Sequence, residues 1–318
     1  MKLIDIYKLA IRKGIEKDPR TRREINEELT RARKEFRKSK GADARAFDKE
    51  RLTNPYADTR ILYGDLDTNI RTIIVGIDME GPEILTAARL NERESDRIDL
   101  VIAHHPEGVA WARFYDVMHL QEAMLKKLGI SEEVARRLLK ERIEEVGRAV
   151  APANHARSVD IARLLDIPYM CIHTPADNHV ASCLQRLFDR KKPKKLSQVV
   201  SILKGIPEYA DGLRKNAGPR ILIGEPNKSA GKVFVDMTGG TEGSKKVFGR
   251  LSQAGVGTIV AMHLGEDHFK HAKDEGMNVV IAGHIASDTL GLNLLLDGIE
   301  KIEKLNIIPC SGFIRVKR

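Results

Sequence analysis

Histidine and carboxylate residues directly after short apolar runs are the residues of this chain best suited to chemistry. They follow the runs DLVIA, YMCI, TIVA and VVIA, each of which reads as a buried strand. In open α/β sheets ligands gather at the carboxyl ends of strands, so these side chains are expected to meet in one crevice. Imidazole nitrogens and carboxylate oxygens suit zinc, iron or manganese. The residues are His104, His105, His173, Asp177, His263, His284 and Asp288.

The spacing within these segments adds to the metal hypothesis. His284 and Asp288 are four positions apart, so both can face the same point if the segment begins a helix. Adjacent histidines normally point apart in a strand, but in a turn fixed by Pro106 the pair His104-His105 could bind two neighbouring metal ions. Taken alone, the pair is as consistent with a structural role as with a functional one.

The elements that must position these residues are short β-rich runs separated by amphipathic helices, which is typical of a mainly parallel sheet covered by helices. At 318 residues the chain is long enough for two domains. No repeat of fixed period is evident. The expected strands are Thr72–Asp78, Asp99–Ala103, Tyr169–Ile172, Arg220–Gly224, Val233–Met237, Thr258–Met262, Val279–Ala282 and Gly312–Val316. The expected helices are Pro82–Glu94, Tyr115–Leu128, Glu132–Val146, Ser158–Leu165, Gly243–Gln253, Asp267–Asp274 and Thr289–Leu305.

Residues 1–62 form a different, highly charged helical segment. Ile25, Leu29, Ala32 and Phe36 give it one narrow apolar stripe, which must pack on the body of the protein or on a partner. The formal net charge is +9, and residues 17–51 hold 13 Lys or Arg against 8 Asp or Glu. This distribution indicates a basic arm rather than a basic catalytic domain. A nucleic-acid or partner contact of this arm is the third and least favoured hypothesis, because mixed charges on a helix more often form a solvated, ion-paired face.

Other sequence features narrow the class of protein. Three cysteines without a CxxC pair argue against a disulfide framework and against a thiolate zinc site. No apolar run approaches the roughly 20 residues that cross a bilayer. The first residues lack a continuous hydrophobic stretch and a cleavage site. We therefore expect a cytoplasmic protein without membrane contact.

Three segments, IAHHP, IHTPAD and AGHIASD, resemble in this order the motifs of the Ngg-interacting-factor-three-like family, also called the GTP cyclohydrolase 1 type 2 homologues. The resemblance covers roughly residues 71–318. It implies two α/β lobes with mixed, mainly parallel sheets, a dinuclear metal site in the cleft between them, and a ring-shaped homohexamer. Residues 1–63 and the long segment 128–153 depart from the family. The implied ligands of two divalent metal ions are His104, His105, Asp177, His284 and Asp288.

Asp288 occupies a position at which the family usually has Glu. We expect a helical extension at 1–62, a first lobe formed by 63–195 with 284–318, and a second lobe at 196–283. Within 190–218, a Lys-rich turn is expected to cross between them. His155 and the glycines of MTGGTEGS are possible further contacts to a ligand or an anion.

The leading functional hypothesis is a metal-dependent hydrolase, because the candidate site is a two-metal His/Asp site without a nucleophilic Ser or Cys motif. His173 and Glu266 are the candidate proton shuttles. The resemblance implies a nucleotide-like or phosphorylated small-molecule substrate. The alternative is a metal carrier, for example of iron, or a regulatory binding protein without turnover.

Overall fold

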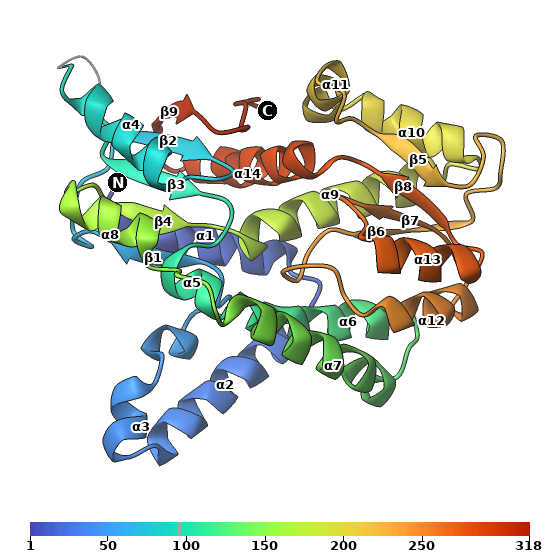
Figure 1. Cartoon of the computed structure of the whole chain (residues 1–318), viewed down its shortest axis with the longest axis horizontal. Helices are drawn as coiled ribbons and strands as arrows, with labels where there is room; N and C mark the ends of the chain where they lie inside the picture. Colours follow the sequence, from blue (N-terminus) through green and yellow to red (C-terminus); the bar gives the residue numbers. More distant parts are fainter. Residues whose placement is uncertain (94–96) are drawn as a thin grey trace.

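The computed structural model describes residues 1–93 and 97–318, and its core is built on two β-sheets (Figure 1). The first sheet has the order β1-β4-β3-β2-β9 and the second has the order β5-β8-β7-β6. The first contains β1 (Arg60–Tyr63), β2 (Thr72–Gly76), β3 (Leu100–Ala103), β4 (Tyr169–Cys171) and β9 (Asn306–Pro309). The second contains β5 (Arg220–Ile223), β6 (Lys232–Asp236), β7 (Val256–Ala261) and β8 (Asn278–Ile281).

Both sheets are mainly parallel, as expected from the continuous apolar runs. In each, one edge strand, β1 or β5, runs antiparallel to its neighbour, and the other neighbouring pairs are parallel. The residues of β2, β3, β4 and β8 are all buried, because helices cover both faces of each sheet. The mixed α/β class with two mainly parallel sheets is confirmed.

The two sheets repeat one topology. The order β1-β4-β3-β2 corresponds strand for strand to β5-β8-β7-β6. The first strand of each set begins a closely similar sequence, RILYG at 60–64 and RILIG at 220–224. Gly64 and Gly224 end these stretches with φ angles of 121° and 109°, a backbone region that favours glycine. The sequence has no repeat of fixed period, yet the two sheets share one strand order, so the repeat is one of topology.

Two long helices between the sheets hold the lobes together. α9 (Thr174–Lys191) follows β4 and α14 (His284–Glu300) follows β8, and the two pack along each other (Figure 1). Their approach is close at Gly291, where an added Cβ would lie 2.5 Å from the carbonyl oxygen of Ala176. Asp177 and Asp288 lie near the N-terminal ends of these helices, so this packing also sets the distance between them.

The remaining helices cover the sheets or connect them. Those of the first lobe are α1 (Leu3–Lys17), α4 (Gly81–Asn91), α5 (Gly108–Ala112), the 3-10 helix η2 (Phe114–His119), α6 (Leu120–Lys127), α7 (Glu132–Val150) and α8 (Arg157–Leu164). Those near the second sheet are α10 (Leu196–Lys204), α11 (Pro207–Arg214), the 3-10 helix η3 (Lys245–Val247), α12 (Phe248–Gln253) and α13 (Glu266–Asp274).

α6 and α7 reach from the first lobe to a glycine-rich loop of the second. Gln121 on α6 donates hydrogen bonds of 2.8 and 2.7 Å to the carbonyl oxygens of Gly239 and Thr241. Arg142 on α7 donates to the carbonyl oxygen of Glu242 at 3.1 Å. Through Arg142, the long segment 128–153 therefore contributes to the contact between the lobes.

The N-terminal 62 residues divide into a buried helix and a projecting arm. α1 packs against α9 and α14, with Leu3, Ile6 and Ala10 fully buried. α2 (Arg22–Lys38), α3 (Gly41–Ala46) and the 3-10 helix η1 (Lys49–Leu52) then leave the body, and Figure 1 shows α2 and α3 extending away from both sheets. The predicted helical character of this segment is confirmed.

Several boundaries differ from expectation. The predicted strand Gly312–Val316 is wrong, because β9 lies earlier at Asn306–Pro309, where its carbonyl and amide groups pair with β2. The predicted helix Gly243–Gln253 begins only at residue 245 with η3, since the glycine-rich loop occupies its start. The predicted end of another helix at Glu94 lies outside the described residues.

Two further helix expectations were wrong in detail. The predicted helix Tyr115–Leu128 is divided into η2 and α6. The predicted helix Thr289–Leu305 is α14, which starts five residues earlier, at His284, and ends at Glu300. α9 has no counterpart among the expected helices, because the HTPAD motif indicates a strand end and gives no signal for the helix that follows it. A short helix was expected after the Lys-rich turn within 190–218, and the structure has two there, α10 and α11.

No helix in the described part of the chain combines the length and the apolar composition needed to cross a membrane.

The close approach of α9 and α14 gives a direct test of this architecture. Gly291→Ala should lower the free energy of unfolding by about 1–3 kcal/mol, because the new methyl group meets backbone rather than a movable side chain. Gly298→Ala on the same helix is the matched control, since its nearest neighbour is the flexible side chain of Lys13 at 3.4 Å. The control should be neutral, or more stable by up to about 1 kcal/mol because alanine favours helix. Equal effects in denaturant titrations of the two variants would contradict the packing described.

Candidate metal centre

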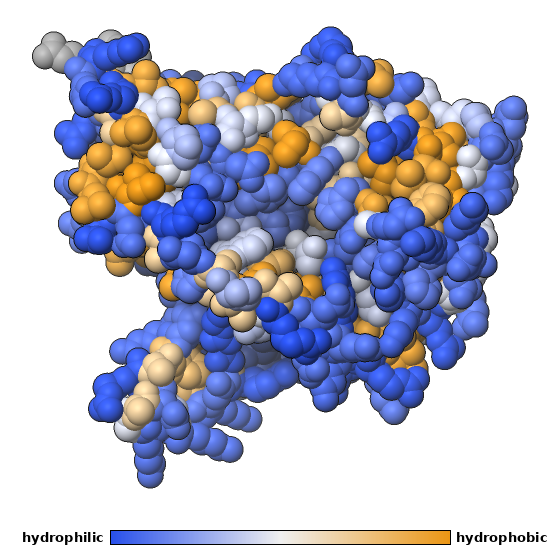
Figure 2. All heavy atoms as spheres, viewed as in Figure 1, coloured by the Kyte–Doolittle hydropathy of each residue, from blue (hydrophilic) through white to orange (hydrophobic). Residues whose placement is uncertain are grey.

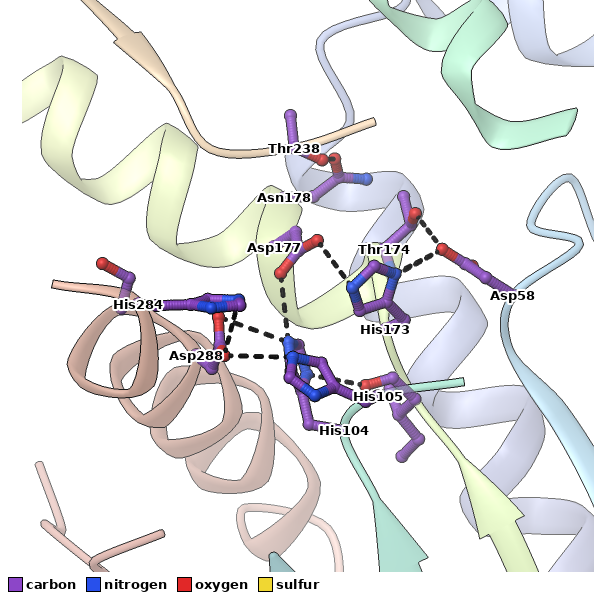
Figure 3. A network of polar contacts seen from close by, with 12 residues as sticks. Asp58, His104, His105, His173, Thr174, Asp177, Asn178, Thr238, His284 and Asp288 are labelled. Atoms are coloured by element: carbon purple, nitrogen blue, oxygen red, sulfur yellow. Dashed lines mark hydrogen bonds and ion pairs between the residues drawn. The ribbon is translucent and has the colours of Figure 1, made fainter. Parts of the chain in front are cut away.

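A cluster of imidazole and carboxylate groups lies at the carboxyl ends of β3 and β4 and at the first turns of α9 and α14 (Figure 3). The structure brings together all five predicted ligands, and His173 joins them. Parallel β3 and β4 end at the same edge of the sheet, which places their histidines together. The packing of α9 against α14 brings the residues of their first turns to the same place. The strand-end expectation is therefore met at the level of geometry.

His104 lies at the centre of the cluster and has no exposed surface. Its Nδ1 donates a hydrogen bond to the carbonyl oxygen of Ile172 at 3.1 Å, so Nε2 faces the carboxylates. Nε2 lies 3.4 Å from Oδ1 of Asp177 and 3.5 Å from Oδ1 of Asp288. A backbone carbonyl thus fixes the ring and leaves one nitrogen free for a ligand.

Carboxylates outside the cluster orient two more rings in the same way. His105 Nδ1 donates to Asp78 at 2.6 Å, and His173 Nδ1 donates to Asp58 at 2.8 Å. Each ring thereby turns Nε2 inward, that of His105 to 3.5 Å from Asp288 and that of His173 to 3.6 Å from Asp177. Outer carboxylates that hold the far nitrogen of a histidine are a frequent feature of metal sites.

Asp288 lies between the histidines. Its Oδ1 faces His104, whereas its Oδ2 is 3.5 Å from Nε2 of His105 and 3.4 Å from Nε2 of His284. The residue is 1% exposed, and both oxygens are buried without a hydrogen-bond partner among the described residues. His104 Nε2 and Asp177 Oδ1 are also buried without such a partner.

These unpartnered atoms fit a cation. Buried polar groups normally have hydrogen-bond partners, and leaving one unpaired is costly. Four such atoms from three neighbouring side chains form an electron-rich concavity that a divalent ion would satisfy. Two overlapping groups have donor atoms within 4.8 Å of one another, His104 with His105 and Asp288, and His104 with His173 and Asp177.

Charge coupling within the cluster changes its proton affinities. Burial opposes protonation of His104 and His105, but the neighbouring carboxylates outweigh burial and raise the pKa of His104 to about 10 and that of His105 to about 9. Burial would raise the pKa of Asp288, yet the surrounding histidines hold it well below its usual range. Burial, with its cationic neighbours, lowers the pKa of His284. The buried carboxylates are therefore stabilised by positive charge on the groups around them, which protons or metal ions can supply.

A cleft between the lobes opens onto this cluster, and Figure 2 shows the hollow near the centre of the molecule. Its outer part has a volume of about 460 Å³ and its inner part about 90 Å³. Both parts are lined by His173, Gly240, Thr241, His263 and His284. A small molecule entering the cleft would therefore meet the His/Asp cluster.

A second polar arrangement lines the cleft beside the cluster. His263 Nδ1 lies 3.2 Å from Oε1 of Glu242, and its ring centroid is 4.9 Å from that of His284. Glu242 also accepts the backbone N–H of Gly265 at 2.6 Å. Its hydrogen bond with His263 raises the pKa of that histidine.

Glu266 is the one predicted site residue that the structure leaves away from the cluster. It begins α13, its side chain is 75% exposed, and it lies 3.5 Å from Lys270. His155 and the glycine-rich loop do border the outer cleft.

Sequence reasoning did not identify Asp58, Asp78 or Glu242. Asp78 had a usable signal, because it follows the apolar run of β2 just as the histidines follow theirs. Asp58 lies in a loop without a recognisable pattern, and the sequence distinguishes Glu242 only as part of the glycine-rich turn.

Comparison with solved structures finds proteins that are similar to this chain. A NIF3 superfamily protein from Sphaerobacter thermophilus is 24% identical over 82% of this chain and 94% of its own, with a TM-score of 0.71. Reduced HcgD from Methanocaldococcus jannaschii is 16% identical over 80% and 89%, with a TM-score of 0.48. A Bacillus cereus protein related to NIF3 is 12% identical over 82% and 91%, with a TM-score of 0.44. No family model and no curated protein matches the chain. The chain has the NIF3-like fold, which confirms the resemblance found in its sequence.

The buried contact between Asp58 and His173 can be tested through stability. Asp58 also accepts hydrogen bonds from the hydroxyl and backbone N–H of Thr174, at 2.6 and 3.3 Å. Asp58→Ala should lower the free energy of unfolding by about 3 kcal/mol, because it leaves buried donors unpaired. Asp67→Ala, which removes an exposed partner of Lys2, should cause no measurable change in the same denaturant titration. If Asp58→Ala were as stable as the wild type, the assigned buried network would be wrong.

Proposed function

We propose that this protein is a metal-dependent hydrolase with a dinuclear centre in the interlobe cleft. The observation that carries the proposal is the set of four buried, unpartnered donor atoms that His104, Asp177 and Asp288 direct toward one another. A water molecule, rather than a protein side chain, would be the nucleophile, because no Ser or Cys motif accompanies the site.

The distances suggest how the five ligands would divide. His105 and His284 face one oxygen of Asp288 and would hold one ion, whereas His104 and Asp177 lie on the side of its other oxygen and would hold the second. Asp288 lies between these two groups and would help to hold the ions. When bound, the ions would supply Lewis acidity and lower the pKa of a water molecule.

Two histidines are placed to move protons beside this centre. His173 is held by Asp58 through Nδ1 and lines the cleft, which suits a group that accepts or returns a proton at Nε2. His263, beside His284, has an analogous relation to Glu242. We propose the pair His263–Glu242 for the role that the sequence had suggested for Glu266, which does not line the cleft.

The outer cleft supports a nucleotide-like substrate. Trp111 lines it and stacks on Phe114, with ring centroids 5.0 Å apart and planes inclined by 14°, which provides an aromatic surface for a planar ring. Arg157 borders the same cavity and offers a cation for a phosphate group. His105 of the metal cluster also borders this part of the cleft, so a molecule bound there would lie beside the centre.

Metal content and turnover test the proposal together. Protein loaded with zinc, manganese or iron should retain close to two ions per chain and hydrolyse at least one member of a panel of nucleotides and phosphoesters. Asp177→Asn should reduce turnover by at least about 100-fold, as expected when an interaction made by a metal site is lost. Glu266→Gln is the matched control, because this carboxylate is exposed and does not line the cleft, and it should behave as the wild type.

The outcomes separate the competing functions. Failure to bind metal would overturn both the dinuclear centre and the hydrolase. Tight retention of metal with turnover equal to that of Asp177→Asn across the panel would overturn the hydrolase alone. Rapid release of iron to a chelator without turnover would instead indicate the metal-carrier alternative.

A further inference from the structure

The projecting arm is a folded helical hairpin rather than a loose basic tail. A capping box formed by Thr21 and Glu24 begins α2, and Phe36 near its end packs on Phe47 beyond α3, with ring centroids 5.1 Å apart. Arg51 lies over the Phe47 ring and pairs with Glu35 at 2.8 Å. These contacts fix the end of the arm at a distance from both sheets (Figure 1).

Exposed cations gather on the outer half of this arm, from the middle of α2 to α3, and the arm is hydrophilic over most of its visible face in Figure 2. We call this group the basic tip. Within the described residues, none of its members forms an ion pair, although other cations of the arm do. The basic tip consists of Arg31, Lys34, Arg37, Lys38, Lys40 and Arg45, all exposed.

The two halves of α2 differ in whether their cations form ion pairs. In the first half Arg23 pairs with Glu27 one turn later, at 2.8 Å. In the second half Arg31, Lys34 and Lys38 follow one another at spacings of three and four, on the side opposite buried Leu29. Like charges at this spacing repel and destabilise a helix by a few tenths of a kcal/mol.

The helix dipole explains only some of the cations in the basic tip. The helix dipole favours the cations in the last turn, Arg37 and Lys38. It does not favour Arg31 and Lys34, which lie further from the end, or Arg45 on the next helix. Glu28 offsets part of the charge of Arg31, and exposed Asp43 lies two residues before Arg45. Among the residues that the structure describes, Lys34, Arg37, Lys38 and Lys40 have no ion-pair partner, so the arm keeps an excess of exposed positive charge.

We propose that the basic tip binds the phosphate backbone of a double-stranded nucleic acid. Several exposed Lys and Arg side chains on a rigid, protruding helix match a surface of regularly spaced phosphates. The proposal is independent of the hydrolase, because no residue of the tip lines the cleft.

The side chains around the tip favour a duplex over other anionic partners. Binding of single strands relies on aromatic side chains that stack on bases, whereas Phe36 and Phe47 are half-buried against each other. A membrane-binding helix needs large apolar residues on the face that enters the lipid. The apolar residues of α3 are alanines, which offer little such surface.

Fluorescence anisotropy with the full-length protein tests the proposal. Labelled 20-base-pair duplexes of DNA and of RNA should bind at low ionic strength, and log K should fall linearly with log salt concentration. Replacing the six residues of the basic tip by Gln should weaken binding at least tenfold and reduce the slope by about 0.9 for each phosphate that the variant no longer neutralises. The affinity and the salt slope of a triple variant, Lys34→Gln with Arg37→Gln and Lys38→Gln, should lie between those of the wild type and those of the six-residue variant.

A second sextuple variant controls for net charge. It replaces six exposed cations elsewhere by Gln, and it should keep the affinity and most of the slope of the wild type. Absence of binding to both duplexes at low salt, equal losses in the two sextuple variants, or stronger binding to single strands or to anionic vesicles would overturn the proposal. The control positions are Arg190, Lys191, Lys194, Lys204, Lys228 and Lys273.

Discussion

Two buried carboxylates, Asp177 and Asp288, face a common group of imidazoles, and the surrounding structure is organised around the need to neutralise them. A charge taken out of water is stable only when it is paired or coordinates a metal. In the absence of metal, protons on His104 and His105 meet this need, which explains the raised pKa values of both. Metal ions would replace those protons, because a histidine must be neutral to act as a ligand.

The duplicated topology explains why these groups meet. In each copy a buried parallel strand, β4 or β8, leads directly into a long helix, and the two helices pack on each other at Gly291. The carboxylates on their first turns are therefore brought together by one helix–helix contact. His104 and His105 follow β3 in the first copy, whereas the equivalent strand β7 of the second copy is followed by Met262 and His263, so the two copies contribute different side chains to the site.

Many of the strands and several residues of the candidate site could be predicted from the sequence. Buried parallel strands are continuous apolar runs, and a histidine or aspartate after such a run stands out in composition. His104, His105 and His284 were found in this way. The hydrogen bond from Nδ1 of His173 to Asp58 was not predicted, because it joins a loop to a helix 115 residues away and leaves no local pattern.

Other features depend on long-range packing. The terminal segment 312–316 has an apolar alternation that suits a strand, yet the free edge of β2 is already occupied by residues 306–309. The relation between RILYG and RILIG is visible in the sequence, but its meaning emerges only from the matching strand orders. The exposed position of Glu266 likewise follows from where α13 begins, which its sequence does not specify.

Anomalous diffraction from crystals grown with manganese or zinc tests the central claim most directly. Data collected above and below the absorption edge of the added metal should give two peaks in the interlobe cleft. Each should lie about 2.0–2.3 Å from a histidine Nε2 and a carboxylate oxygen of the cluster, with Asp288 between them. Absence of any peak among His104, Asp177 and Asp288 would contradict the account.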